Sequence, residues 1–162
     1  VRPMGRTARG VRGMMLEPDQ RLIAMLVAED ESQSVLTATE NGYGKRTSIV
    51  EYTRHGRGTK GMIAIQQSER NGRVVAATLV RPEDEIMLIT DKGVLVRTRV
   101  AEIRELGRAT QGVTLIALDD GAKLSGLQRI VENDANDTDG ATDGADSSEA
   151  GDAGDTPEAP KD

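Results

Sequence analysis

An internal repeat with a period of 51 residues is the feature that most constrains the fold of this chain. Three segments share the pattern G-R-x-x-(basic or Gln)-G, and their final glycines are Gly10, Gly61 and Gly112. A second pattern keeps the same spacing, because residues 39–47 (TENGYGKRT) correspond to residues 90–98 (TDKGVLVRT). Self-similarity at one fixed period is typical of repeat architectures, so the chain is predicted to be an array of similar structural units.

Each repeat is predicted to contain about four short strands, because aliphatic runs alternate with turn signals such as Asn41-Gly42 and Lys92-Gly93. Four-stranded units of this size indicate an all-β, propeller-like array. Residues 1–131 hold about 2.6 repeats, whereas propellers close with about four to eight blades, so we expect further blades before Val1. The one helix-like stretch is residues 100–106. Strands are expected at residues 22–27, 34–39, 45–47, 62–65, 74–80, 86–90, 94–98, 113–118 and 124–131.

Charge divides the chain into two parts. Residues 1–131 hold 20 Lys and Arg against 16 Asp and Glu, a net charge of +4. Residues 132–162 hold 1 against 11, a net charge of −10, and their only apolar residues other than glycine and proline are alanines. Without large apolar side chains to bury, such a segment cannot offset the entropy lost on folding. We therefore predict a partial β-array at residues 1–131 and a disordered acidic tail at residues 132–162.

Composition excludes several classes of site. The absence of cysteine rules out disulfides and thiolate metal sites, and the single histidine, His55, rules out a His-rich zinc site. Tyr43 and Tyr52 are the only aromatic residues, which is too few for a base-stacking surface. No apolar run approaches the roughly 20 residues that span a bilayer. We expect a cytoplasmic protein and no metal or cofactor site in this segment.

Basic residues recur in the glycine-arginine segments and in the strands that follow the Thr-x-x-Gly turns. Arginine and lysine form charge-assisted hydrogen bonds to phosphate oxygens, and glycine permits a close backbone approach. Equivalent loops of neighbouring blades would place these clusters at regular intervals along a curved rim suited to bending duplex DNA. The predicted DNA-binding residues are Arg6, Arg9, Arg12, Lys45, Arg46, Arg57, Lys60, Arg97, Arg99 and Arg108.

A purely structural interpretation stays open at this point. The glycines could adopt positive φ at blade turns, with the arginines paired to the repeating Glu51 and Glu102. In that case the array would be a protein-binding scaffold that the acidic tail keeps soluble. A nucleotide site is not supported, because residues 42–47 lack the G-x-x-x-x-G-K-(S/T) pattern. No catalytic combination of residues is visible.

The motifs at residues 5–13, 39–47 and 57–61 resemble the C-terminal domain of bacterial DNA gyrase A, and the resemblance covers residues 1–131. It implies a β-pinwheel whose rim wraps duplex DNA, in a type IIA topoisomerase that introduces negative supercoils with ATP. It also implies that this segment is not catalytic, since the cleaving tyrosine and the ATP and Mg²⁺ sites belong to other domains. The implied partners are duplex DNA, gyrase B and a second copy of gyrase A, in an A2B2 heterotetramer associated with the nucleoid.

One departure from that family concerns its hallmark box, Gln-Arg-Arg-Gly-Gly-Lys-Gly. Residues 55–61 (HGRGTKG) keep it only in degraded form. In gyrase the box lies in the first blade, and we expect this chain to begin after it. The related A protein of topoisomerase IV, which lacks a proper box, therefore remains an alternative, although the well-kept motifs and the acidic tail favour gyrase.

Overall fold

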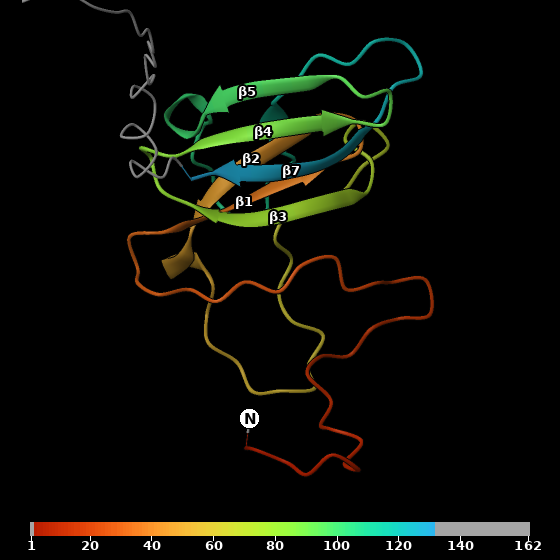
Figure 1. Ribbon diagram of the computed structural model, residues 1–162, viewed down its shortest axis with the longest axis vertical. Helices are drawn as coiled ribbons and strands as arrows, with labels where there is room; N and C mark the ends of the chain where they lie inside the picture. Colours follow the sequence, from red (N-terminus) through yellow and green to blue (C-terminus); the bar gives the residue numbers. More distant parts are fainter. Residues whose placement is uncertain (1, 132–162) are drawn as a thin grey trace, which may run out of the picture. The chain divides into compact units, whose positions relative to one another are not determined.

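Two antiparallel β-sheets form the centre of the computed structural model, which describes residues 2–131 (Figure 1). The first sheet has the order β3-β1-β2-β6, and the second has the order β5-β4-β7. The strands are β1 (Ser34–Thr39), β2 (Tyr43–Ser48), β3 (Val74–Val80), β4 (Glu85–Thr90), β5 (Leu95–Arg99), β6 (Val113–Thr114) and β7 (Leu124–Ile130). The helical elements of the described residues are two 3-10 turns, η1 (Ile49–Glu51) and η2 (Val100–Glu102).

The 51-residue period of the sequence is reproduced in three dimensions. The hairpin β1–β2 and its turn η1 recur as the hairpin β4–β5 and its turn η2. Even the irregularity in strand pairing recurs, because the register shifts between Ala38 and Thr39 in one sheet and between Ile89 and Thr90 in the other. The predicted repeat and the all-β fold class are therefore confirmed.

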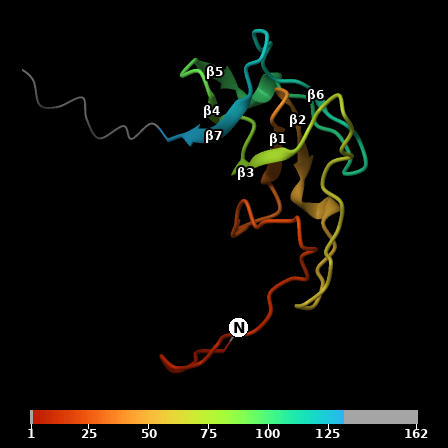
Figure 2. The same cartoon turned by 90° about the vertical axis from the view of Figure 1, so that its right-hand side faces the viewer.

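Each sheet is completed by a strand from the following repeat. Strand β3 pairs with β1, and β7 pairs with β4 in the same way. The described chain thus contains one four-stranded blade and three strands of a second blade (Figure 2). Consecutive repeats cannot separate without exposing the sheet edge that they share.

The hydrophobic core lies between the two sheets. Along β4 every second side chain is buried, as expected for a strand with one covered face, whereas five of the six residues of β1 are buried, so β1 is covered on both faces. Strands β3 and β7 also contact each other, so the two blades share one core. Its buried members are Leu36, Ala38, Val80, Ile86, Leu88, Val100, Ile103, Ile116 and Leu124.

Several sequence-based expectations are wrong in detail. Residues 22–27 form no strand, and Met25 and Val27 are largely exposed. Strands β3 and β7 each pair with the hairpin of the preceding repeat, and residues 2–21 contain no hairpin with which residues 22–27 could pair. Residues 62–65 are also irregular, and only one 3-10 turn forms within residues 100–106. The predicted acidic tail lies outside the described residues.

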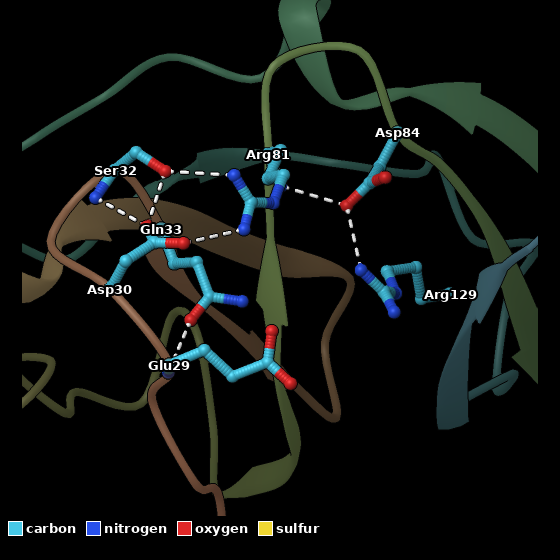
Figure 3. A network of polar contacts seen from close by, with 7 residues as sticks. All are labelled: Glu29, Asp30, Ser32, Gln33, Arg81, Asp84 and Arg129. Atoms are coloured by element: carbon cyan, nitrogen blue, oxygen red, sulfur yellow. Dashed lines mark hydrogen bonds and ion pairs between the residues drawn. The ribbon is translucent and has the colours of Figure 1, made fainter.

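Polar contacts connect the segments that lead into the two hairpins (Figure 3). The carboxylate of Asp84 accepts a hydrogen bond from the main-chain nitrogen of Arg81 at 2.8 Å and lies 3.3 Å from Nη1 of Arg129. On the other side, the side-chain oxygen of Gln33 accepts from the main-chain nitrogen of Glu29 at 3.0 Å. The acidic stretches before the two hairpins, residues 29–31 and 83–85, therefore take part in the structure of the blades.

Candidate nucleic-acid interface

The three glycine-arginine segments, called turn segments 1 (residues 5–10), 2 (residues 56–61) and 3 (residues 107–112), are connected by a hydrogen bond that repeats. The main-chain nitrogen of Met15 donates to the carbonyl oxygen of Thr59 at 2.9 Å. One repeat later, the nitrogen of Gln66 donates to the oxygen of Thr110, also at 2.9 Å. Turn segment 2 is thus attached to the residues that follow turn segment 1, and turn segment 3 is attached to the residues that follow turn segment 2. The three turn segments therefore follow one another at intervals of one repeat.

The backbone conformation of the final residue explains why each of the three turn segments ends in glycine. Gly10, Gly61 and Gly112 have φ values of 81°, 76° and 83°, a region that side-chain-bearing residues rarely adopt. At Gly112 a Cβ atom would also lie 2.6 Å from the carbonyl oxygen of Gly44. The structural interpretation therefore holds for the glycines, and the function of the arginines is a separate question.

Turn segments 1 and 2 expose their basic side chains. Arg6, Arg9 and Arg57 are exposed, and so is Arg12, which follows turn segment 1. The main-chain nitrogen of Gly58 donates to the carbonyl oxygen of Gly13 at 2.8 Å, which brings the residues that follow turn segment 1 next to turn segment 2. This arrangement produces a run of cationic groups on a backbone that lies outside both sheets (Figures 1 and 2).

Lys60 completes this exposed group while forming an ion pair. Its ammonium group lies 2.7 Å from Oε1 of Glu17, and the two side chains are 71% and 50% exposed. Ion pairs this open to solvent contribute little energy, so a phosphate could replace the carboxylate at low cost. Lys60 therefore stays a candidate for anion contact.

Turn segment 3 is held more tightly. Nη1 of Arg108 donates to the carbonyl oxygen of Ile63 at 3.4 Å, and the side chain is half-buried. Its Nε atom is buried without a hydrogen-bond partner among the described residues. A guanidinium group has five N–H donors, so these internal contacts leave much of the donor capacity of Arg108 unused.

Two predicted contact residues prove to be internal. Lys45 is fully buried, and its ammonium group donates to the carbonyl oxygens of Gly107 and Arg108. The Arg46 side chain is only 16% exposed, and its Nε donates to the oxygen of Ile103 at 2.7 Å. The expectation that Lys45 contacts DNA is corrected, since a phosphate cannot reach a buried group, and the contacts of Arg46 make it mainly a structural residue.

Arg97 and Arg99 lie on β5 and share one carboxylate. The Arg97 side chain forms an ion pair with Glu85, and Nε of Arg99 lies 3.8 Å from Oε1 of the same residue. Arg99 nevertheless keeps 74% of its side chain exposed. Both β5 arginines therefore lie beside a carboxylate of the neighbouring strand β4.

Sequence reasoning missed other exposed arginines near these segments. Arg54 lies just before turn segment 2, and Arg104 lies just before turn segment 3. Arg70 covers the ring of Tyr43, with its guanidinium carbon 4.8 Å from the ring centroid. None of these three arginines recurs at the 51-residue spacing, so the periodicity that revealed the other candidates could not reveal them.

The described residues hold no group of three or more His, Asp or Glu side chains arranged to bind a metal ion. Within residues 2–131 no helix has the length and apolar character that crossing a membrane requires. The chemistry this surface offers is the binding of anions by guanidinium and ammonium groups.

Comparison with known proteins agrees with this arrangement. The family pattern described as "DNA gyrase C-terminal domain, beta-propeller" matches residues 1–29, 33–81 and 84–130. The curated DNA gyrase A proteins of Neisseria gonorrhoeae and Pseudomonas aeruginosa are 50% identical over 139 residues and 53% identical over 137 residues. These alignments cover 83% and 85% of this chain but only 15% of each relative.

Solved structures show the same fold. The structure of a DNA gyrase A C-terminal domain matches with a TM-score of 0.74 and 28% identity, covering 81% of this chain and 44% of that one. The C-terminal domain of a DNA topoisomerase IV matches with a TM-score of 0.70 and 20% identity, covering 75% and 38%. Repeat, blade architecture and family pattern agree, and the chain belongs to the family of DNA gyrase C-terminal domains with the beta-propeller fold.

Proposed function

We propose that this chain binds duplex DNA along its turn segments and bends it, as the DNA-wrapping module of a gyrase A protein. The observation that carries the proposal is the hydrogen bond repeated at Met15–Thr59 and Gln66–Thr110, because it places successive basic segments in equivalent positions. Phosphates occur all along a duplex, so cationic groups at a regular interval can follow its backbone without reading its sequence.

Electrostatics support the same proposal. Arg6, Arg9, Arg12 and Arg57 are exposed, so they can donate to phosphate oxygens without first losing a strong internal contact. Bending a duplex by 40–90° costs on the order of 1–6 kcal/mol, which several charge-assisted contacts can offset. The net charge of +4 over residues 1–131 adds a favourable long-range term.

For the whole protein that would contain this chain, we propose the activity after which its relatives are named, which is that of DNA gyrase. In this proposal the chain is a non-catalytic part of a type II topoisomerase that supercoils DNA, in a heterotetramer of two gyrase A and two gyrase B proteins. ATP and Mg²⁺ would act through other domains, and the enzyme would work in the cytoplasm on the nucleoid. The names of the curated relatives favour gyrase over topoisomerase IV.

The test is duplex-DNA affinity measured across a salt series. Replacing Arg57 and Lys60 by glutamine should weaken binding to all sequences alike and reduce the log–log salt slope by about 1.8, or about 0.9 for each lost phosphate contact. The matched control replaces Lys92 and Lys123, two exposed lysines outside the turn segments, and removes the same charge.

The competing function is a propeller scaffold that binds proteins. A scaffold would bind DNA weakly, and the two double variants would have the same small effect. A flat salt slope for the folded wild-type chain would therefore contradict DNA wrapping and favour the scaffold.

A further inference from the structure

Lys45 carries a charge that is buried, so its ammonium group cannot contact DNA directly. The side chain rises from β2 and has no exposed surface. Its ammonium group donates to the carbonyl oxygens of Gly107 and Arg108 and to Oγ1 of Thr110, the last at 3.1 Å. An ammonium group has three donors, so all three are satisfied by turn segment 3.

A second side chain on the same face of β2 extends this contact. Oγ1 of Thr47 donates to the carbonyl oxygen of Leu106 at 2.8 Å. Residues 45 and 47 of a strand point to the same side, so the pair binds three successive carbonyl groups, those of residues 106, 107 and 108. The backbone at Arg108 is therefore fixed from the strand beneath it.

Burial of the ammonium group has an energetic cost that must be offset. Desolvation lowers the pKa of Lys45, and the nearby charge of Arg108 lowers it further, whereas Glu51 opposes the shift. A buried charge persists only when its hydrogen bonds compensate for lost hydration. Methionine would fill similar space without that cost, so packing alone does not explain a lysine here.

The other hairpin provides an internal comparison. At the 51-residue spacing, Lys45 and Thr47 on β2 correspond to Val96 and Thr98 on β5. In the described chain, β2 is bordered by turn segment 3 and β6, whereas β5 pairs only with β4. The lysine thus occurs on the hairpin that holds a turn segment, and valine occurs on the hairpin that holds none among residues 2–131.

We propose that Lys45 is a positioning residue for DNA binding: it fixes turn segment 3 so that the Arg108 guanidinium is presented to the phosphate backbone. This inference rests on the proposed function. Arg108 is the contact group, and Lys45 acts through it. Because turn segment 3 is attached to Gln66 through Thr110, the same contact also fixes the spacing to the preceding segment.

The test compares Lys45→Met, Arg108→Gln and the double variant in the 162-residue chain, with a duplex of mixed sequence as the probe. Arg108→Gln should weaken binding roughly tenfold, the factor expected for one charge-assisted hydrogen bond. Lys45→Met should cause a similar loss, and the double variant should lose no more than either single variant, because both changes remove the same contact. Lys45→Arg should restore most of the affinity.

Two measurements separate positioning from a general loss of stability. Amide exchange in Lys45→Met should accelerate at Leu106 and Leu115, whose nitrogens donate to Arg46 and Gly42, and should not change along β4 and β7. Leu88→Ala, which removes a fully buried side chain from β4, should lower stability without changing the salt slope. If Lys45→Met does not fold, Thr110→Ala removes one acceptor from the ammonium group and should give a smaller loss of the same kind.

The outcomes distinguish the two proposals. If the wild-type chain binds DNA and Arg108→Gln weakens it, but folded Lys45→Met or Thr110→Ala binds as the wild type does, the positioning role is overturned and DNA binding stands. Additive losses in the double variant would also overturn it. If the folded wild-type chain shows no salt-dependent binding, the DNA-binding function itself fails.

Discussion

Nη2 of Arg81 lies 2.7 Å from Oδ2 of Asp30, and the two residues are 51 positions apart, which is one repeat length. Nη1 of the same arginine donates to Oγ of Ser32 at 2.9 Å (Figure 3). The segment that enters the first hairpin is thereby joined to the segment that enters the second. The blades are coupled at their polar ends as well as through the shared core.

The Asp30–Arg81 pair predicts a stability effect that depends on pH. Hydrogen bonds from Ser32 and then from Arg81 lower the pKa of Asp30 below its ordinary value of 3.8. The carboxylate therefore contributes stability above pH 3.8, and this contribution is lost as the pH falls through the folded-state pKa. Urea unfolding should show Asp30→Asn less stable than wild type near neutral pH and equal to it in strong acid. A difference that does not change with pH would contradict this.

Gly112 should tolerate substitution less well than Gly10. Both glycines have positive φ, so alanine at either costs about 1–2 kcal/mol where the conformation is enforced. A Cβ atom at Gly112 would also meet the oxygen of Gly44 at 2.6 Å, whereas nothing lies within 4 Å of one at Gly10. Thermal unfolding should therefore show a larger loss for Gly112→Ala. Equal losses would mean that turn segment 3 is not packed against β2.

Removing residues 132–162 should strengthen DNA binding. This tail carries a net charge of −10 and would compete with DNA phosphates for the basic turn segments. The gain should be greatest at low salt and should shrink as salt screens the charges. A neutral Gly-Ser tail of the same length is the control for excluded volume. Equal affinity of the full and shortened chains at low salt would contradict a competing role for the tail.

Most strands can be predicted from aliphatic runs and turn signals, including β3 and β7, whose partners β1 and β4 lie in the preceding repeat. The predicted strands at residues 34–39 and 86–90 agree with β1 and β4, because a tight turn and its hairpin are local features. Residues 22–27 have similar aliphatic composition but form no strand, because the described chain offers no hairpin for them to join. Composition therefore indicates which segments can be strands, and pairing decides which of them form.

The candidate site shows the same limit. Exposed contact candidates such as Arg9 and Arg57 follow from charge and period, which are both visible in the sequence. The burial of Lys45 could not be predicted, because its acceptors at Gly107 and Arg108 lie more than sixty residues later in the chain. A basic residue in a repeated motif can thus bind the next repeat instead of a ligand.

Bending of a duplex by this chain is the most direct test of DNA wrapping. The measurement is energy transfer between fluorophores at the two ends of a short duplex, taken at saturating protein. Transfer should rise when the wild-type chain binds and should rise much less with Arg57→Gln/Lys60→Gln at equal occupancy, because fewer phosphate contacts then offset the cost of bending. Saturated binding with no change in transfer would show that the DNA stays straight and would contradict a wrapping function.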